Sequence, residues 1–340
     1  MRMRQAMTGA QVTAPPERSL STPCPACEGP LQRWRSVRPA EPTLTAPVAL
    51  GRCRSCGSAA TLGPAAPEWH EGGAFARPPR MSVLAAPALE LFDRHRLRLV
   101  SGAVPDPPAP SADRPPAATS RRLVDVGAGR GRFVAHARRR GWDAEGLEPA
   151  ATRVRAAAQR YGVRLHAEGI EAARFAPGSL DAVSAWHVIE HLEDPGAAVG
   201  QMAAWLRPGG ALLVGVPNLA SLQARLGGGR WFHLDVPRHR THFTPVGLEA
   251  LMRRAGLRPY ATHHLLLEHN PFGMWQSLVN RLTPTPSYLY HLLKANAPLR
   301  AADLLPTVLA LPALPLAAAL EATAGLARRG GTIALLAVRP

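Results

Sequence analysis

The feature that most constrains the fold is an alternation of strand and helix patterns that begins at Arg121. Parallel strands need a crossover connection, which is usually a helix, so this alternation predicts a doubly wound α/β sheet. Ligands of such sheets bind at the carboxyl ends of the strands. Strands are expected at 122–127, 143–148, 163–168, 180–188, 211–218, 257–269 and 331–339, with helices at 132–141, 151–162, 195–210 and 245–256.

A glycine-rich loop follows the first of these strands, in the stretch VDVGAGRGRF. Gly127, Gly129 and Gly131 are spaced two apart, whereas a dinucleotide fingerprint would read G-x-G-x-x-G. Asp125 would repel a pyrophosphate but would suit an ammonium group. Glu148 ends the second expected strand, and its two oxygens can accept hydrogen bonds from both hydroxyls of a ribose. An amino acid joined to a nucleoside fits both carboxylates, which indicates S-adenosylmethionine as the cofactor.

From these residues onward the chain resembles the class I S-adenosylmethionine-dependent methyltransferases, in particular the group that includes ubiquinone-biosynthesis O-methyltransferases. The matching stretches are VDVGAGRGRF, GLEPA, SLDAVSAWHVIEHLEDP, LRPGGALLVGVPN and WFHLDVPRHRTHFTPVGLEALMRRAGL. The resemblance implies a seven-stranded Rossmann-like sheet whose last two strands form an antiparallel hairpin. It also implies that Asp125 and the three glycines hold the methionine part, that Glu148 holds the ribose, and that Gly169, Ile170 and Glu171 lie by the adenine.

All four cysteines fall into two C-x2-C pairs, CPAC and CRSC. Two such turns deliver the four thiolates of a tetrahedral zinc site, so Cys24, Cys27, Cys53 and Cys56 predict a structural zinc ribbon over 20–62. Disulfides in a secreted module and a redox pair are the alternatives. The N-terminal residues lack the apolar core of a signal peptide, so we expect a cytoplasmic protein, in which thiols stay reduced. Enzymes of the resembled group often carry such a ribbon.

The region 63–120 is expected to connect the ribbon to a second domain at 121–340. Its segment 81–100 has a helical pattern interrupted near Pro87, and 101–120 holds six prolines and no aromatic residue. Such a composition is typical of an exposed linker.

Two histidine-containing segments are candidates for chemistry on the acceptor. A hydroxyl or amine acceptor must lose a proton to a base during methyl transfer. His187 lies at the end of the fourth expected strand, where it could act as the base or position the cofactor, and His191 follows on the same side of a helical turn. The stretch WFHLDVPRHRTHF offers His233 and His239 as further candidate bases, and Trp231, Asp235, Arg238 and His242 as candidate substrate contacts, unless the loop only satisfies its own polar groups.

An apolar insertion at 269–330 separates the last two expected strands, and its segment 304–320 carries no charge. The simplest interpretation is a helical cap that buries its apolar face on the domain or on a dimer partner. Alternatively, the segment takes a hydrophobic acceptor or makes peripheral contact with a membrane. Three prolines and the return of the final strand to the sheet argue against a membrane span.

The formal charge of +16 does not by itself indicate a nucleic-acid partner, because the positive residues are scattered along the chain and all but Lys294 are arginine. The sequence therefore predicts methyl transfer from S-adenosylmethionine to a small-molecule acceptor, such as a hydrophobic lipid-linked, quinone-like or sugar-linked compound. A nucleic-acid or protein methyltransferase, a binding protein that has lost catalysis, and a dehydrogenase are the alternatives.

Overall fold

The computed structural model describes residues 18–39, 44, 46–64, 86–104, 120–266, 268, 270–295 and 297–340. The proline-rich linker expected at 101–120 lies outside these residues except for its ends.

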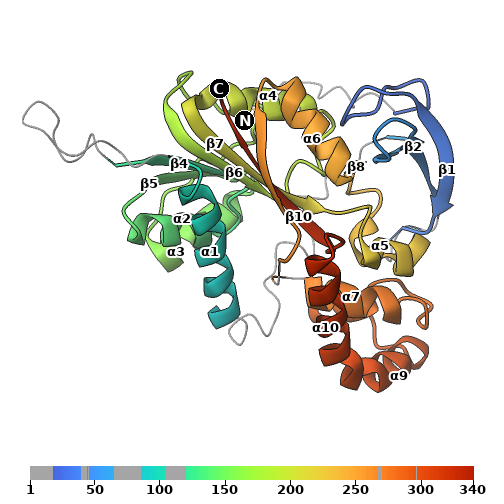
Figure 1. Ribbon diagram of the computed structural model, residues 1–340. Helices are drawn as coiled ribbons and strands as arrows, with labels where there is room; N and C mark the ends of the chain where they lie inside the picture. Colours follow the sequence, from blue (N-terminus) through green and yellow to red (C-terminus); the bar gives the residue numbers. More distant parts are fainter. Residues whose placement is uncertain are drawn as a thin grey trace, which may run out of the picture.

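A six-stranded sheet in the order β5-β4-β6-β7-β10-β9 forms the centre of the molecule (Figure 1). Its strands are β4 (Arg122–Val126), β5 (Asp143–Leu147), β6 (Leu180–Trp186), β7 (Leu206–Pro217), β9 (Arg258–His263) and β10 (Thr332–Val338). The first four run parallel to one another, and β10 is antiparallel to both of its neighbours. The predicted doubly wound sheet is confirmed, and so is the antiparallel pairing of the last two strands.

Of the seven expected strands, the one at 163–168 is reduced to a single bridge between Leu147 and His166. The backbone bends at 167–168 directly after this pair, which ends the ladder. The helix expected at 195–210 is also shorter, because α4 (Pro195–Trp205) ends where Leu206 pairs with Leu180 and enters β7.

Helices cover both faces of the sheet. Alternate residues of β7 face opposite sides, so Leu212 and Val214 join one hydrophobic cluster and Leu213 joins another. The first cluster is covered by α4 and α6 (Pro245–Arg254), and the second by α1 (Ala86–Ser101), α2 (Arg132–Arg139) and α3 (Ala151–Tyr161). The structure therefore places α1 in a layer of the main domain, although the sequence assigned its residues to the connecting region.

The direction of β10 decides where the apolar insertion lies. Thr332 at the start of β10 is paired with Pro217 at the end of β7, and His263 at the end of β9 is paired with Ala334. Both ends of the insertion are therefore at the carboxyl edge of the parallel strands. The insertion folds into α7 (Asn270–Val279), α8 (Tyr288–Leu293), α9 (Ala301–Ala310), a 3-10 turn at Leu311–Ala313 and α10 (Leu314–Leu326).

The cysteine-containing module shares a strand with the main domain. Its sheet has the order β1-β2-β3-β8, with β1 (Leu31–Val37), β2 (Val48–Cys53) and β3 (Ala59–Thr61) from the N-terminal region. The fourth strand, β8 (Thr241–His242), belongs to the histidine-rich segment 231–243. This segment follows α5 (Leu222–Gly227) and the 3-10 turn Gly228–Arg230, and it contains the 3-10 turn Phe232–Leu234. The module is thus fixed to one side of the main sheet (Figure 1).

Two helical glycines test how tightly this module packs on α6. A Cβ atom at Gly247 would lie 2.1 Å from Ser58 Oγ and 3.2 Å from Cys56 Sγ, whereas a Cβ atom at Gly200 on α4 would meet nothing within 4 Å. We expect Gly247→Ala to lower the free energy of unfolding by about 1–3 kcal/mol through overpacking. Gly200→Ala should instead raise it by up to about 1 kcal/mol through helix propensity. Denaturant titrations measure both, and equal effects of the two substitutions would contradict the observed packing.

Candidate functional site

A cavity of about 580 Å³ lies at the carboxyl edge of the sheet. This volume is in the range of small-molecule binding sites. It is lined by the ends of β4 and β5, by Arg153 of α3, by the segments 168–171, 187–192 and 232–239, and by the insertion. Of the residues predicted from the sequence, the cavity is lined by Gly127, Glu148, Gly169, Ile170, Glu171, His187, His191, His233, Asp235, Arg238 and His239.

The glycine loop needs its glycines for two physical reasons. Gly127, Gly129 and Gly131 all have positive φ angles, of 68°, 58° and 74°. A Cβ atom at Gly127 would also lie 2.4 Å from Val188, and one at Gly131 would lie 2.7 Å from Val163. Gly127 reaches the cavity wall, whereas Gly129 and Gly131 are not among its lining residues and shape the turn into α2.

Glu148 is buried at the cavity wall and is held by backbone donors. Its carboxylate accepts hydrogen bonds from the N–H groups of Gly129 and Ala150, at 2.9 and 3.0 Å. Arg153, which also lines the cavity, lies 3.4 Å from the same carboxylate. This acid therefore links the glycine loop to the start of α3 and has a fixed orientation.

Asp125 has a different environment from the one expected. It is buried, and its Oδ1 accepts hydrogen bonds from Arg96 at 2.9 Å and from Ser184 at 2.5 Å. It is not among the residues that line the cavity. The charge of Asp125 is paired with that of Arg96 in α1. Contact between Asp125 and a ligand's ammonium group would therefore require this ion pair to rearrange.

His187 is presented to the cavity by a strained turn after β6. Its φ angle of 53° is unusual for a residue with a side chain and costs roughly 1–3 kcal/mol. Its Nδ1 lies 2.9 Å from the buried carboxylate of Glu190. The ring is nearly parallel to that of His233, with an interplanar angle of 6° and 6.2 Å between ring centroids. A buried carboxylate that orients an imidazole is a common arrangement of general bases.

Two further histidines of the site have pKa values that burial lowers. Burial lowers the pKa of His191 and lowers that of His239 well below its ordinary value. The Nδ1–H of His239 donates to the carbonyl of His233 at 2.8 Å, and Arg238 forms an ion pair with Asp235. These contacts give the segment 232–239 a defined conformation over the cavity.

Two predicted substrate contacts do not reach the cavity. Trp231 is buried and its Nε1–H donates to Gln223 at 3.4 Å. His242 lies in β8, with its Nε2 3.1 Å from the hydroxyl of Thr61. Burial lowers the pKa of His242 to about 3. In the structure both residues hold the segment in place rather than line the cavity.

The insertion supplies lining residues that sequence reasoning missed, namely Ser287, Tyr290 and His291. Tyr290 packs edge-on against Phe232, and its burial raises the pKa of its hydroxyl to about 12. These residues precede the uncharged segment that drew attention in the sequence. Only the position of the insertion at the carboxyl edge could have indicated them.

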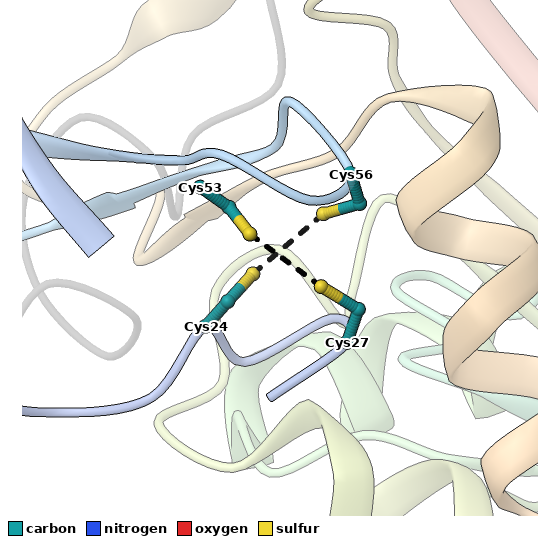
Figure 2. Close-up of side chains that lie close together, drawn as sticks. All are labelled: Cys24, Cys27, Cys53 and Cys56. Atoms are coloured by element: carbon teal, nitrogen blue, oxygen red, sulfur yellow. Dashed lines mark hydrogen bonds between the residues drawn. The ribbon is translucent and has the colours of Figure 1, made fainter. Parts of the chain in front are cut away.

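The four cysteine sulfur atoms lie close enough together to bind one metal ion. All four sulfur atoms lie within 4.8 Å of one another, with 3.8 Å between Cys24 and Cys56 and 3.5 Å between Cys27 and Cys53 (Figure 2). Tetrahedral zinc with bonds of about 2.3 Å places its sulfur ligands about 3.8 Å apart. The hydrogen bond between the two thiols lowers the pKa of Cys56 and raises that of Cys24. The geometry therefore fits a closed structural zinc site.

A second group of possible metal ligands lies in the cavity wall. Ligand atoms of Glu190, His191 and His239 are all within 4.8 Å of one another. The Oε2 of Glu190 accepts no hydrogen bond from the described residues. The set of one carboxylate and two neutral imidazoles could hold a divalent cation.

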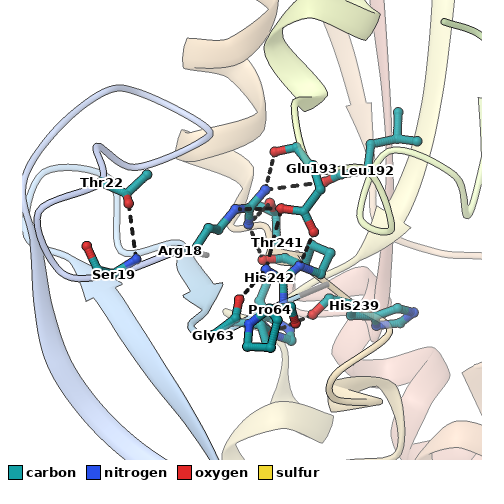
Figure 3. Close-up of polar contacts among 12 residues, drawn as sticks. Arg18, Ser19, Thr22, Gly63, Pro64, Leu192, Glu193, His239, Thr241 and His242 are labelled. Atoms are coloured by element: carbon teal, nitrogen blue, oxygen red, sulfur yellow. Dashed lines mark hydrogen bonds and ion pairs between the residues drawn. The ribbon is translucent and has the colours of Figure 1, made fainter. Parts of the chain in front are cut away.

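Hydrogen bonds connect the cysteine module to the cavity segment. The hydroxyl of Thr61 donates to the carbonyl of His239 at 2.5 Å, and Arg240 donates to the carbonyl of Gly63 at 2.8 Å. Arg18 donates to the carbonyl of Arg240 and pairs with Glu193 (Figure 3). The module thereby fixes the segment just beyond the residues that line the cavity.

Comparisons with known proteins show that the chain is similar to methyltransferases. Residues 92–262 match the model of a methyltransferase domain family. A ubiquinone biosynthesis O-methyltransferase of Cupriavidus pinatubonensis is 29% identical over 149 residues, which are 40% of this chain and 60% of that protein. An uncharacterized methyltransferase of a Mycobacterium species is 39% identical over 92 residues, which are 26% of this chain and 36% of that protein. The chain thus spans less than two thirds of the length of these two relatives.

A solved structure of a geranyl diphosphate methyltransferase in complex with GPP and sinefungin covers 79% of this chain and 83% of its own. Its sequence identity is 17% and its TM-score is 0.47.

Substitution of one cysteine tests the metal site and its link to the cavity. We expect the unmutated protein to hold one zinc ion per chain and Cys53→Ser to lose it. Because β3 pairs with β8, amide hydrogen exchange at 239–242 should then become faster. Ser55→Ala changes an exposed non-ligand in the same turn and should keep both the metal and the slow exchange. Elemental analysis that finds no zinc in the unmutated protein would refute the site.

Proposed function

The chain belongs to the methyltransferase domain family, whose model matches half of it, and from this premise we propose that it transfers a methyl group from S-adenosylmethionine to a small-molecule acceptor. The observation that carries the proposal is the cavity at the carboxyl edge of the sheet. It brings together Gly127 of the glycine loop, Glu148, His187 and His233.

The glycine loop, Glu148 and Ile170 suit a nucleoside joined to an amino acid. Gly127 offers bare backbone for close approach, and Glu148 offers acceptor oxygens for ribose hydroxyls at a position fixed by Gly129 and Ala150. Ile170, which also lines the cavity, offers an apolar surface for a base. When bound, S-adenosylmethionine supplies a methyl group already activated by a sulfonium, so the protein's main task is to position the two reactants.

We assign the proton transfer to His187. Its Nδ1–H is directed to Glu190, which leaves Nε2 as the acceptor for a proton from a hydroxyl of the substrate. Glu190 acts as a positioning residue through this hydrogen bond. His239 is a weaker candidate, because burial lowers its pKa well below the ordinary value. His233, stacked parallel to His187, forms the facing wall.

The acceptor we propose is a hydroxyl-bearing molecule with an apolar part, such as a lipid-linked or quinone-like compound. Two observations support this choice. Phe232 and Tyr290 place aromatic surface at the cavity wall, and several curated relatives are named for an O-methylation step in ubiquinone biosynthesis. The four thiols of the zinc site suit a reducing compartment, so we place the protein in the cytoplasm. The zinc ribbon would serve the fold rather than the chemistry.

The ribose contact can be tested on the cofactor alone. Glu148→Gln keeps the shape of the side chain but removes its charge and one of its two acceptor oxygens. We expect the affinity for S-adenosylmethionine to fall at least tenfold, or about 1.4 kcal/mol, in equilibrium dialysis. Glu145→Gln on the same β5 strand, at a side chain outside the cavity, should change it by less than about twofold. Equal affinities of the two variants would remove Glu148 from the site.

The assignment of the base requires a measure of methyl transfer. The protein is incubated with methyl-labelled S-adenosylmethionine and a total lipid extract, and label is counted in the organic phase. His187→Gln should lower the rate roughly 100-fold or more while cofactor affinity changes by less than about threefold. His166→Gln, at a half-exposed histidine beside β5, should have no effect. If His187→Gln transfers label at the unmutated rate, the base lies elsewhere.

A further inference from the structure

The outer surface of α9 and α10 is apolar and uncovered. The continuous helical segment Ala301–Leu326 has a mean hydropathy of 1.7 over its most apolar 18 residues, and only 17% of that window is buried. A core helix of this composition would be mostly buried. We call the exposed large side chains here the apolar surface, which comprises Leu305, Val308, Leu309, Leu311, Leu314 and Leu316.

The exposed charges in the part of the chain that carries this surface have one sign. Between 281 and 329, the exposed charged residues that the structure describes are Arg281, Arg300, Arg328 and Arg329. The two acids in this stretch, Asp303 and Glu321, are 1% and 2% exposed. Asp303 accepts hydrogen bonds from the backbone and side chain of Thr285, and Glu321 accepts them from Gln223 and Gly331. The exposed large apolar side chains of this stretch are therefore accompanied by positive charges, and its two acids are buried.

The inner side of the same helices is fixed to the domain. Trp275 of α7 donates a hydrogen bond from Nε1 to the carbonyl of Ala310 at 2.7 Å. The contacts of Glu321 tie α10 to α5 and to the start of β10. The helices therefore lie against the protein along their length and do not leave it as a span, so a partner can reach only their outer side.

We propose that the apolar surface docks on the face of an anionic lipid bilayer. Leucine side chains would enter the boundary between headgroups and acyl chains, and the arginines would pair with lipid phosphates. A second copy of this chain fits less well. A two-fold interface packs the same patch against itself, so its arginines would find no exposed acid in the partner's patch.

This surface lies in the same insertion as three lining residues of the cavity. Ser287, Tyr290 and His291 line the cavity, and α8 packs against α9. A docked protein would therefore hold its cavity beside the bilayer, where an amphiphilic acceptor is concentrated. This consequence for the acceptor rests on the proposed function, whereas the docking itself does not.

Co-sedimentation with vesicles tests the docking. The 340-residue chain is mixed with vesicles of phosphatidylglycerol and phosphatidylcholine in equal parts, and with phosphatidylcholine alone. We expect strong binding to the first, weaker binding to the second, and loss of binding as salt is raised. The double variant Leu305→Gln/Leu309→Gln should bind at least about tenfold more weakly. The matched control Leu91→Gln/Val246→Gln changes side chains of similar exposure in α1 and α6 and should bind like the unmutated chain.

The outcomes separate docking from the proposed function. Unmutated protein that stays in the supernatant, or a double variant that binds as well as the control, overturns the docking. So does a dimer in light scattering that the double variant abolishes, since the surface would then join two copies. Circular dichroism of the same samples shows that each variant is folded, and calorimetry with S-adenosylmethionine tests cofactor binding separately. Vesicle binding without cofactor binding in the unmutated protein would overturn the proposed function and leave the docking intact.

Discussion

The pairing of β10 between β7 and β9 determines most of what this structure can do. Because β10 runs antiparallel to both neighbours, the chain between β9 and β10 must leave and re-enter at the carboxyl edge of the sheet. In a doubly wound sheet that edge is also where ligands bind. An insertion at this point in the chain is therefore placed over the cavity by topology alone. Its side chains can line the cavity on one side while its helices present a second surface to the surroundings.

The opposite side of the cavity is held by the N-terminal module. The short strand β8 is common to the histidine-rich segment and to the cysteine sheet, and hydrogen bonds from Thr61 and Arg18 reach the backbone at 239–240. A four-cysteine metal site carries no open position for chemistry. A metal ion bound there would act on the cavity only through the fold, because it would make rigid the module whose strand β3 pairs with β8. The N-terminal module and the insertion between β9 and β10 thus complete the cavity at the edge of the central sheet.

Features encoded within short stretches could be predicted from the sequence. The glycine loop, the position of Glu148 and the cysteine pairs depend on local spacing, and the structure brings each group together. Contacts between distant segments could not be predicted. Asp125 meets Arg96 from a helix that the sequence placed outside the domain, and His242 pairs with the ribbon instead of lining the cavity. Tyr290 and Ser287 carried no signal, because the fold of the insertion alone places them at the site. The strand expected at 163–168 had a suitable pattern, but the bend after His166 stops its pairing.

The cavity beside Gly127 and Glu148 is the proposed site for S-adenosylmethionine. The most direct measurement is a calorimetric titration of the zinc-loaded chain with S-adenosylmethionine and, separately, with NAD. We predict saturable binding of S-adenosylmethionine at one site per chain and no binding of NAD, because the carboxylate of Glu148 already accepts the N–H of Gly129 in the loop where a pyrophosphate would lie. Binding of NAD, or binding of neither ligand by folded protein, would contradict the account.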